Sequence, residues 1–245
     1  MGALHDGHLS LIELAKNYSD EVVVSIFVNP LQFENKDDLE KYPRDLEADS
    51  QMALTAGATR IWAPTVEDIY PDKPIIISSG KHGSKYEGVN RPGHFDGVLT
   101  VVDRLFKKVE PTVAIFGEKD FQQLFIIQKW VRESDLPIEI ITAPIVRDID
   151  GLALSSRNIR LGSDGRESAL IISKALYAAR ESSDPAATML ALLASEPGFT
   201  LDYAEVIDEE TFEPETSTTR KRRALIAGWV NGVRLLDNMQ MRAQV

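Results

Sequence analysis

Two imidazoles stand three residues apart near the start of the chain, in the segment His5-Asp6-Gly7-His8. An apolar pattern follows at once and predicts a helix over about residues 9–18, with Asp6 as its N-cap. The first turn of a helix attracts anions, and glycine lets a phosphate approach the backbone closely. Imidazole N–H groups there can donate hydrogen bonds to phosphoryl oxygens as charge builds on them. A turn with two surface histidines is the alternative, and a metal pair is disfavoured because no third ligand is evident nearby.

Two further segments place small and basic residues where the chain changes from one element to the next. Gly117-Glu118-Lys119-Asp120 lies between a strand pattern and a helix pattern, where an α/β fold has its anion-binding turn. Lys119 can face a phosphate there as a point charge. Leu154-Ser155-Ser156-Arg157-Asn158 offers two hydroxyl groups and an arginine, which suit a polyphosphate. A charged helix start and a polar interdomain turn are the alternatives for these segments taken alone.

Other polar residues are less specific by themselves. Arg91-Pro92-Gly93-His94-Phe95 is ambiguous, and Gln32 and Gln123 are neutral amides that each follow a strand pattern. The order of the turns is more informative, because His-x-x-His, Gly-x-Lys and Ser-Ser-Arg at strand ends resemble the nucleotidyl-transferring branch of α/β folds. The chain has no G-x-x-x-x-G-K-[ST] and no G-x-G-x-x-G after a strand, which disfavours a kinase or an NAD enzyme.

Strand and helix patterns alternate in the first part of the chain and must position these turns. Short apolar runs predict strands at residues 21–28, 59–64, 112–117 and 138–142. Helix patterns cover residues 46–56, 98–109 and 121–131, with Gly57 as a C-cap of the first. This alternation predicts a parallel sheet with right-handed crossovers, in which ligands bind beyond the carboxyl ends of the strands.

The pattern changes near Asn158. Helices are predicted at residues 163–182 and 186–194, strands at 203–207 and 224–227, and a polar loop at 209–223. We therefore expect an α/β protein with two domains. Residues 1–158 form a Rossmann-like parallel-sheet domain, and residues 159–245 form a smaller α+β domain.

The overall charge limits the partners. The 245 residues carry 27 basic and 38 acidic side chains, a net charge of −11 and an isoelectric point near 4.9. Such a chain lacks the basic footprint of a nucleic-acid binder and has no attraction to an anionic membrane. With no cysteine, no secretory signal and no apolar run near the ~20 residues that span a bilayer, we expect a soluble cytoplasmic protein. The basic cluster Arg220-Lys221-Arg222-Arg223 is interpreted as a solvated loop or a substrate-facing patch.

Taken together, these segments resemble the pantoate–β-alanine ligase family. The matching motifs are residues 1–8, 25–30 with Gln32 and Phe33, 42–44, 91–95, 116–123 and 154–158, and more weakly 228–229 and 234–238. Several long motifs in the right order over almost the whole chain are far more specific than any one of them. The resemblance implies an ATP-dependent ligase that converts pantoate to pantoyl adenylate with release of pyrophosphate. The pantoyl group then passes to β-alanine, giving pantothenate and AMP.

The resemblance also implies roles for individual residues. The catalytic residues are His8, which is usually assigned the acid role, His5, Lys119 and Arg157. The ATP-binding residues are Met1, Gly2, Ala3, Leu4, His5, Asp6, Gly7, His8, Gly117, Glu118, Lys119, Asp120, Val146, Leu154, Ser155, Ser156 and Arg157. The substrate-binding residues are Gln32, Gln123, Asn29, Arg91 and His94. Because the chain is acidic, Lys119, Arg157 and the two histidines are the candidate local cations for its anionic substrates.

The same resemblance implies the partners. Mg²⁺ is expected on the triphosphate of ATP, with no protein ligand assigned, and no tightly bound organic cofactor is expected. The family forms dimers, so we expect a homodimer.

One departure from the family concerns the first strand. In the family a β-strand and a Pro-Thr pair precede the His-x-x-His motif, whereas this chain begins at the motif's own methionine. In a doubly wound sheet that strand lies in the middle, so its loss leaves two neighbouring edges unpaired. We therefore expect the natural protein to start upstream. The alternatives are a truncated member that is inactive or binds only nucleotide, and a related nucleotidyltransferase with another substrate.

Overall fold

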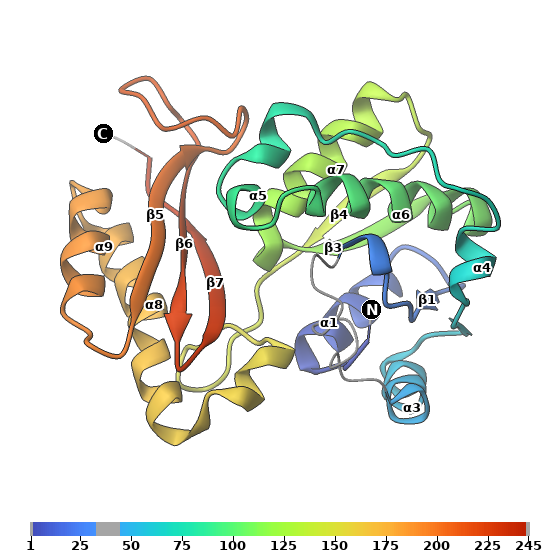
Figure 1. The fold of residues 1–245 in the computed structure, drawn as a ribbon, viewed down its shortest axis with the longest axis horizontal. Coiled ribbons are helices and arrows are strands. Elements are labelled where there is room, and N and C mark those ends of the chain that lie inside the picture. The colour runs from blue at the N-terminus through green and yellow to red at the C-terminus, as the bar shows by residue number, and fades with distance from the viewer. Residues whose placement is uncertain (1, 33–44, 244–245) are drawn as a thin grey trace. The chain divides into compact units, whose positions relative to one another are not determined.

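The computed structural model describes residues 2–32 and 45–243 and divides into two compact units, Met1–Pro144 and Ile145–Val245 (Figure 1). Three parts of the predicted motifs, Met1, Phe33 and residues 42–44, lie outside the described residues. The division falls after Pro144, whereas the sequence placed it near Asn158. Contacts explain the difference, because Arg147 pairs with Asp237 and Leu152 joins the core of the C-terminal unit.

The N-terminal unit alternates helices with short strands. Its helices are α1 (Asp6–Ala15), α3 (Leu46–Ala56), α4 (Val66–Ile69), α5 (Glu87–Asn90), α6 (His94–Val109) and α7 (Phe121–Glu133). Its strands are β1 (Val23–Ser25), β2 (Arg60–Trp62), β3 (Val113–Gly117) and β4 (Glu139–Ala143). Single 3₁₀ turns are η1 (Pro30–Gln32), η2 (Gly80–Ser84) and η3 (Glu118–Asp120).

The strands of this unit are parallel, as predicted. β1 pairs with β2, with Val24 opposite Ile61, and β3 pairs with β4, with Ile115 opposite Ile141. In the described part of the chain β1 and β3 are not paired with each other, so the four strands form two pairs rather than one sheet. Figure 1 shows α1 on one side of the β3–β4 pair and α6 and α7 on the other.

Local sequence explains where the helices of this unit begin and end. α3 ends at Gly57, whose φ of 109° is the left-handed conformation that glycine adopts without strain, so the predicted C-cap is confirmed. α6 begins at His94, directly after Gly93 with φ of 77°, and therefore includes part of the Arg91–Phe95 motif. Its apolar face buries Phe95, Val98, Leu99, Val101 and Val102.

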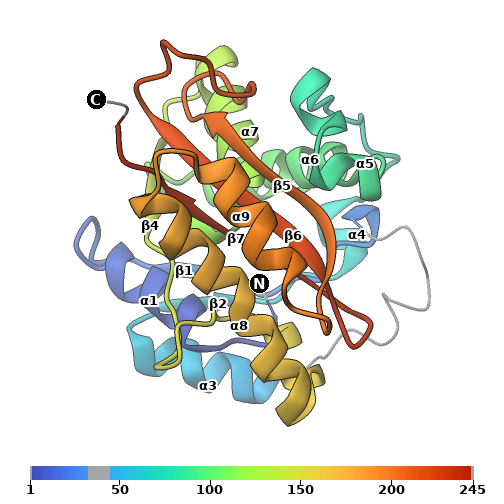
Figure 2. The same cartoon turned by 90° about the vertical axis from the view of Figure 1, so that its left-hand side faces the viewer.

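The C-terminal unit is a three-stranded antiparallel sheet with two helices on one face (Figure 2). After η4 (Ser156–Arg160) come α8 (Gly162–Glu181) and α9 (Pro185–Ala194), then β5 (Thr200–Asp208), β6 (Arg222–Val230) and β7 (Val233–Gln240). The core between the helices and the sheet includes Leu176, Met189, Leu193, Ile226 and Leu235. The α+β character of this part is confirmed.

The sequence analysis missed β7. Its connection to β6 is the two-residue turn Asn231-Gly232, in which both residues have positive φ, 49° and 72°. This is the usual requirement of a type I′ hairpin, and Asn-Gly between two apolar runs is its strongest short-range signal. The signal was therefore present in the sequence.

Of the two interpretations of the basic cluster, the solvated loop is wrong for two of its arginines. Arg222 and Arg223 begin β6 and are 5% and 4% exposed, so they are neither solvated nor in a loop. Arg222 pairs with Glu215, and Arg223 pairs with Glu209 at 2.7 Å. Buried guanidinium groups need such partners, and the acidic residues of the preceding loop supply them.

No helix in the described ranges is both long and apolar enough to cross a membrane.

Candidate functional site

His5 is the N-cap of α1, in place of the predicted Asp6. Its backbone is extended, and its ring Nδ1 accepts the N–H of Gly7 at 3.1 Å. Its carbonyl oxygen also accepts the N–H groups of His8 and Leu9, at 2.6 and 3.1 Å. Because Nδ1 is the acceptor, the neutral ring carries its proton on Nε2. His5 therefore closes the first turn of the helix and keeps one N–H donor.

His8 stands beside His5, with 4.1 Å between the ring centroids and 40° between the ring planes. Its Nδ1 is buried without a hydrogen-bond partner among the described residues. Burial, followed by the nearby charge of His5, lowers the pKa of His8 to about 3. Burial and then Lys119 also lower the pKa of His5. These shifts favour the neutral form of both rings, in which each imidazole has one N–H donor.

The turn after β3 approaches the histidine pair. Lys119 in η3 lowers the pKa of both histidines, and its Nζ lies 3.9 Å from a carboxylate oxygen of Asp120. The negative charge of Asp120 partly opposes the lowering of the pKa of His5, His8 and also His94 at the start of α6. Helix α1 packs against β3, the strand that leads into this turn. The His-x-x-His segment and the predicted anion-binding turn therefore belong to neighbouring elements of the N-terminal unit.

Gln32 ends η1, and its backbone is held by residues that were predicted to bind substrate. Its carbonyl oxygen lies 3.2 Å from Nδ1 of His94 and accepts a hydrogen bond from Arg91 at 3.4 Å. Burial and then Arg91 lower the pKa of His94 to about 4. η1 also lies close against α6, because a Cβ on Gly97 would stand 2.4 Å from the carbonyl oxygen of Leu31. Arg91 and His94 thus hold the backbone of Gln32 in place.

Asn29 lies one turn before Gln32 and is 2% exposed. Its amide nitrogen donates to the carbonyl of Gly97 at 3.1 Å. Its amide oxygen accepts the N–H of Leu31 at 3.2 Å and the hydroxyl of Tyr70 at 2.9 Å. The side chain predicted to contact substrate is therefore already engaged in joining η1 to α6 and α4.

Gln123 lies half-buried in the first turn of α7, directly after η3. Its neighbour Gln122, which the sequence analysis did not single out, is buried. The Gln122 amide accepts the N–H of Glu87 at 3.1 Å and donates to the carbonyls of His82 and Lys85, at 2.7 and 2.8 Å. Gln122 thus fixes the segment of η2 and α5. Nothing in the local sequence distinguishes Gln122, which holds this segment, from its neighbour Gln123, which is predicted to bind substrate.

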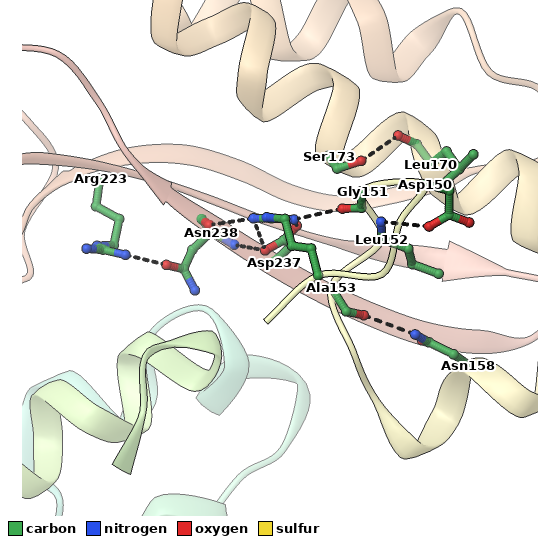
Figure 3. Close-up of polar contacts among 11 residues, drawn as sticks. Asp150, Gly151, Leu152, Ala153, Asn158, Leu170, Ser173, Arg223, Asp237 and Asn238 are labelled. Atoms are coloured by element: carbon green, nitrogen blue, oxygen red, sulfur yellow. Dashed lines mark hydrogen bonds and ion pairs between the residues drawn. The ribbon is translucent and has the colours of Figure 1, made fainter. Parts of the chain in front are cut away.

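The remaining predicted ATP contacts lie together in the C-terminal unit. Leu154 donates its N–H to the carbonyl of Val146 at 3.0 Å, which pairs the two ends of a short hairpin. The hydroxyl of Ser155 then caps η4 by accepting the N–H of Arg157 at 3.2 Å. Asn158 donates to the carbonyl of Ala153, and its amide oxygen is buried without a partner in the described part of the chain (Figure 3).

Arg147 anchors this hairpin to the sheet of its own unit. Its guanidinium binds both carboxylate oxygens of Asp237, at 2.5 and 3.0 Å, and the carbonyl of Gly151 at 3.1 Å. Arg223 donates to the amide oxygen of Asn238, the residue after Asp237, at 2.6 Å (Figure 3). The sequence could not reveal the pairing of Arg147 with Asp237, because the two residues are 90 positions apart.

Among the residues that the structure describes, no group of three or more His, Asp or Glu side chains is placed to hold a metal ion.

The burial of two imidazoles predicts an acid-sensitive fold. His8 has a pKa near 6.5 in the unfolded state but only about 3 in the folded state. Below pH 6.5 the unfolded state therefore binds a proton at His8 that the folded state does not bind. The contribution to stability is complete above pH 6.5 and is lost as the pH falls toward 3, by up to ~1.4 kcal/mol per pH unit. His94 adds a loss of the same sign between pH 6.5 and about 4. Urea unfolding at pH 7, 6 and 5 measures how steeply the free energy of unfolding changes with pH. We expect this slope to be shallower for His8→Asn. Equal slopes would contradict the assignment.

Comparisons with known proteins agree with this fold and these motifs. The sequence model of the Pantoate-beta-alanine ligase family matches residues 1–240. The chain is 44% identical to pantothenate synthetase of Acidothermus cellulolyticus, covering 99% of this chain and 84% of that protein. It is 46% identical to pantoate–beta-alanine ligase of Schizosaccharomyces pombe, covering 98% of this chain and 88% of that protein.

Solved structures give the same result. The crystal structure of pantothenate synthetase from Thermus thermophilus aligns with a TM-score of 0.92 at 41% identity, covering 98% of this chain and 90% of that one. The pantoate-beta-alanine ligase of Francisella tularensis, complexed with beta-gamma ATP and beta-alanine, aligns with a TM-score of 0.79 at 36% identity, covering 98% and 86%. The α/β fold and these matches place the chain in the ligase class of enzymes. It belongs to the pantoate-beta-alanine ligase family.

Proposed function

We propose that the chain condenses (R)-pantoate with β-alanine to give pantothenate, a step of coenzyme A biosynthesis. ATP is the co-substrate, pantoyl adenylate is the intermediate, and AMP and pyrophosphate are released. The observation that carries the proposal is the neutral histidine pair at the start of α1 beside Lys119, in a chain that the family model matches over residues 1–240.

In the first step a carboxylate oxygen of pantoate attacks the α-phosphorus of ATP, and the bond from that phosphorus to the bridging oxygen of pyrophosphate breaks. Negative charge builds on phosphoryl oxygens in this transition state. Neutral imidazole N–H groups on His5 and His8 can donate to these oxygens, and the ammonium of Lys119 supplies a full positive charge. Ser155, Ser156 and Arg157 are proposed as further ATP contacts. Mg²⁺ enters with ATP as part of the substrate.

In the second step the amine of β-alanine attacks the acyl carbon of pantoyl adenylate, and the bond to the AMP oxygen breaks. The amine must be neutral to attack, so a proton leaves it as the amide forms. Gln32 and Gln123 suit the carboxylate and hydroxyls of pantoate, because amides both donate and accept without adding charge. Gln32 is proposed to lie where β-alanine enters.

The test is pantoate-dependent exchange of labelled pyrophosphate into ATP, followed by pantothenate formation once β-alanine is added. Exchange without β-alanine establishes acyl-adenylate chemistry, because only reversal of the first step returns the label to ATP. A folded chain that shows no exchange would contradict the proposal. A thermal shift with ATP but not with pantoate would then indicate a protein that only binds nucleotide.

Replacing Gln123 separates the two substrates. We expect Gln123→Ala to raise the KM for pantoate by about tenfold, the cost of ~1–2 kcal/mol of hydrogen bonding, while the KM for ATP changes little. Gln128→Ala is the matched control, because this half-buried glutamine lies on the same helix and donates to the hydroxyl of Thr142 at 3.3 Å. Pyrophosphate exchange at varied pantoate and ATP measures both constants. An equal rise in the two constants would contradict the assignment of Gln123 to pantoate.

A further inference from the structure

A buried carboxylate outside the predicted motifs contacts the backbone just before His5. Asp49 lies in the first turns of α3 and is 4% exposed. One of its carboxylate oxygens accepts the N–H of Ala3 at 2.8 Å, and the other accepts the N–H of Leu4 at 2.7 Å. Such short distances are typical of charge-assisted hydrogen bonds. This pair of bonds joins α3 to residues 2–5, which we call the N-terminal strap.

The N-terminal strap has a conformation that its own sequence does not favour. Ala3 has a φ of 50°, in the left-handed region that a residue with a Cβ rarely adopts. Conformations of this kind persist only where the surroundings determine them. The side chain of Leu4 lies in the core with Ile12 and Ala53, which anchors one point of the strap. The two bonds to Asp49 are what fix its backbone.

The N-terminal strap leads directly into the histidine pair. His5 follows Leu4 and caps α1 through its Nδ1. The ring centroid of His8 lies 4.1 Å from that of His5. A shift of the backbone at Leu4 therefore moves the helix cap and its ring together. Catalytic groups lose most of their effect when they are displaced by about 1 Å.

We propose that Asp49 is a positioning residue of the histidine site, whose carboxylate holds the N-terminal strap and thereby sets the places of His5 and His8. The geometric part of this inference depends only on the contacts of Asp49 with Ala3 and Leu4. Its kinetic consequence rests on the proposed function. Asp49 acts through the strap and has no part in binding or reacting with substrate.

Asp49→Asn tests the proposal because it preserves shape and removes one acceptor. The amide oxygen accepts one of the two N–H groups, and the amide NH₂ then faces the other donor. We expect the Ala3 and Leu4 amides to exchange with solvent at least about tenfold faster by NMR, as local opening becomes easier. The pKa values of His5 and His8 should rise toward 6.5 in an NMR titration. The kcat of pyrophosphate exchange should fall by about 10², with a smaller change in the KM for ATP.

Asp45→Ala is the matched control on the same helix. Asp45 caps α3 by accepting the N–H of Ala48 at 2.9 Å, so its loss weakens α3 without removing either bond to the N-terminal strap. We expect a lower melting temperature, with unchanged exchange at Ala3 and Leu4 and unchanged histidine titration. The control therefore separates damage to α3 from release of the strap.

The possible outcomes are distinct. Wild-type amide exchange, wild-type histidine titration or an unchanged kcat in folded Asp49→Asn overturns the proposal. If that variant does not fold, the unsubstituted chain decides, because exchange of Ala3 and Leu4 at the rate of unprotected amides also overturns it. A third outcome is faster amide exchange and raised histidine pKa values in Asp49→Asn, with no pyrophosphate exchange even in the unsubstituted chain. That outcome supports the positioning role and contradicts the proposed function instead.

Discussion

Replacing His8 by alanine is expected to lower the rate of pantoate-dependent pyrophosphate exchange by roughly 10²–10³, the usual cost of one well-placed transition-state donor. The ring is neutral at pH 7, since burial lowers its pKa to about 3. In the proposed mechanism it offers one N–H to a phosphoryl oxygen whose charge grows only during the reaction. We expect kcat to fall with little change in the KM for ATP, because a donor that acts in the transition state adds little to ground-state binding.

The same substitution should leave the fold intact. Alanine is the best helix former, and the change removes a buried nitrogen that has no partner among the described residues. Ser10→Ala is the matched control, because this side chain lies on the same helix and binds the carbonyl of Gly7 at 2.9 Å. Near-UV circular dichroism and exchange kinetics on both variants make the comparison. A His8→Ala enzyme with an unchanged rate of exchange would remove His8 from the mechanism.

Local patterns predicted most of the N-terminal unit because the forces that form its elements are local. The apolar face of α6, the strand at residues 113–117 and the end of α3 at Gly57 each follow from residues within a few positions of one another. The His-x-x-His segment was placed correctly at a helix start. The cap was assigned to Asp6 because aspartate is the commoner cap, whereas the ring of His5 takes that role.

The parts that could not be predicted depend on contacts between distant residues. Asn29 and His94 have the polar groups of a substrate site, but they contact other parts of the protein, including the carbonyl groups of Gly97 and Gln32. No local pattern distinguishes a buried side chain that holds a turn from one that waits for a ligand. Arg223 shows the same limit, since its partners Glu209 and Asn238, which make burial of the charge possible, are 14 and 15 residues away.

The ion pair of Arg147 with Asp237 should have the largest effect on stability. The two side chains are 14% and 4% exposed, and the carboxylate accepts two bonds from one guanidinium. Removing one partner of a buried pair leaves an uncompensated charge and costs ~3–5 kcal/mol. We therefore expect Asp237→Ala to unfold the C-terminal unit at much lower urea concentration, with faster hydrogen exchange in β6 and β7. The hairpin that leads into the proposed ATP contacts Ser155, Ser156 and Arg157 loses its anchor, so on the proposed function ATP affinity should fall as well.

Two further variants show whether the charge itself is the cause. In Arg147→Met with Asp237→Leu, both charges are replaced by apolar groups of similar volume, so this double variant should recover most of the stability that Asp237→Ala loses. Arg166 of α8 pairs with Asp148 and Asp150 of the same hairpin, where solvent reaches all three side chains and screens their charges. Arg166→Ala should therefore change stability far less. If the double variant is as unstable as Asp237→Ala, lost packing rather than an unpaired charge explains the effect. If it is stable but still binds ATP weakly, the ion pair serves to hold the hairpin in place for the nucleotide rather than to stabilise the fold.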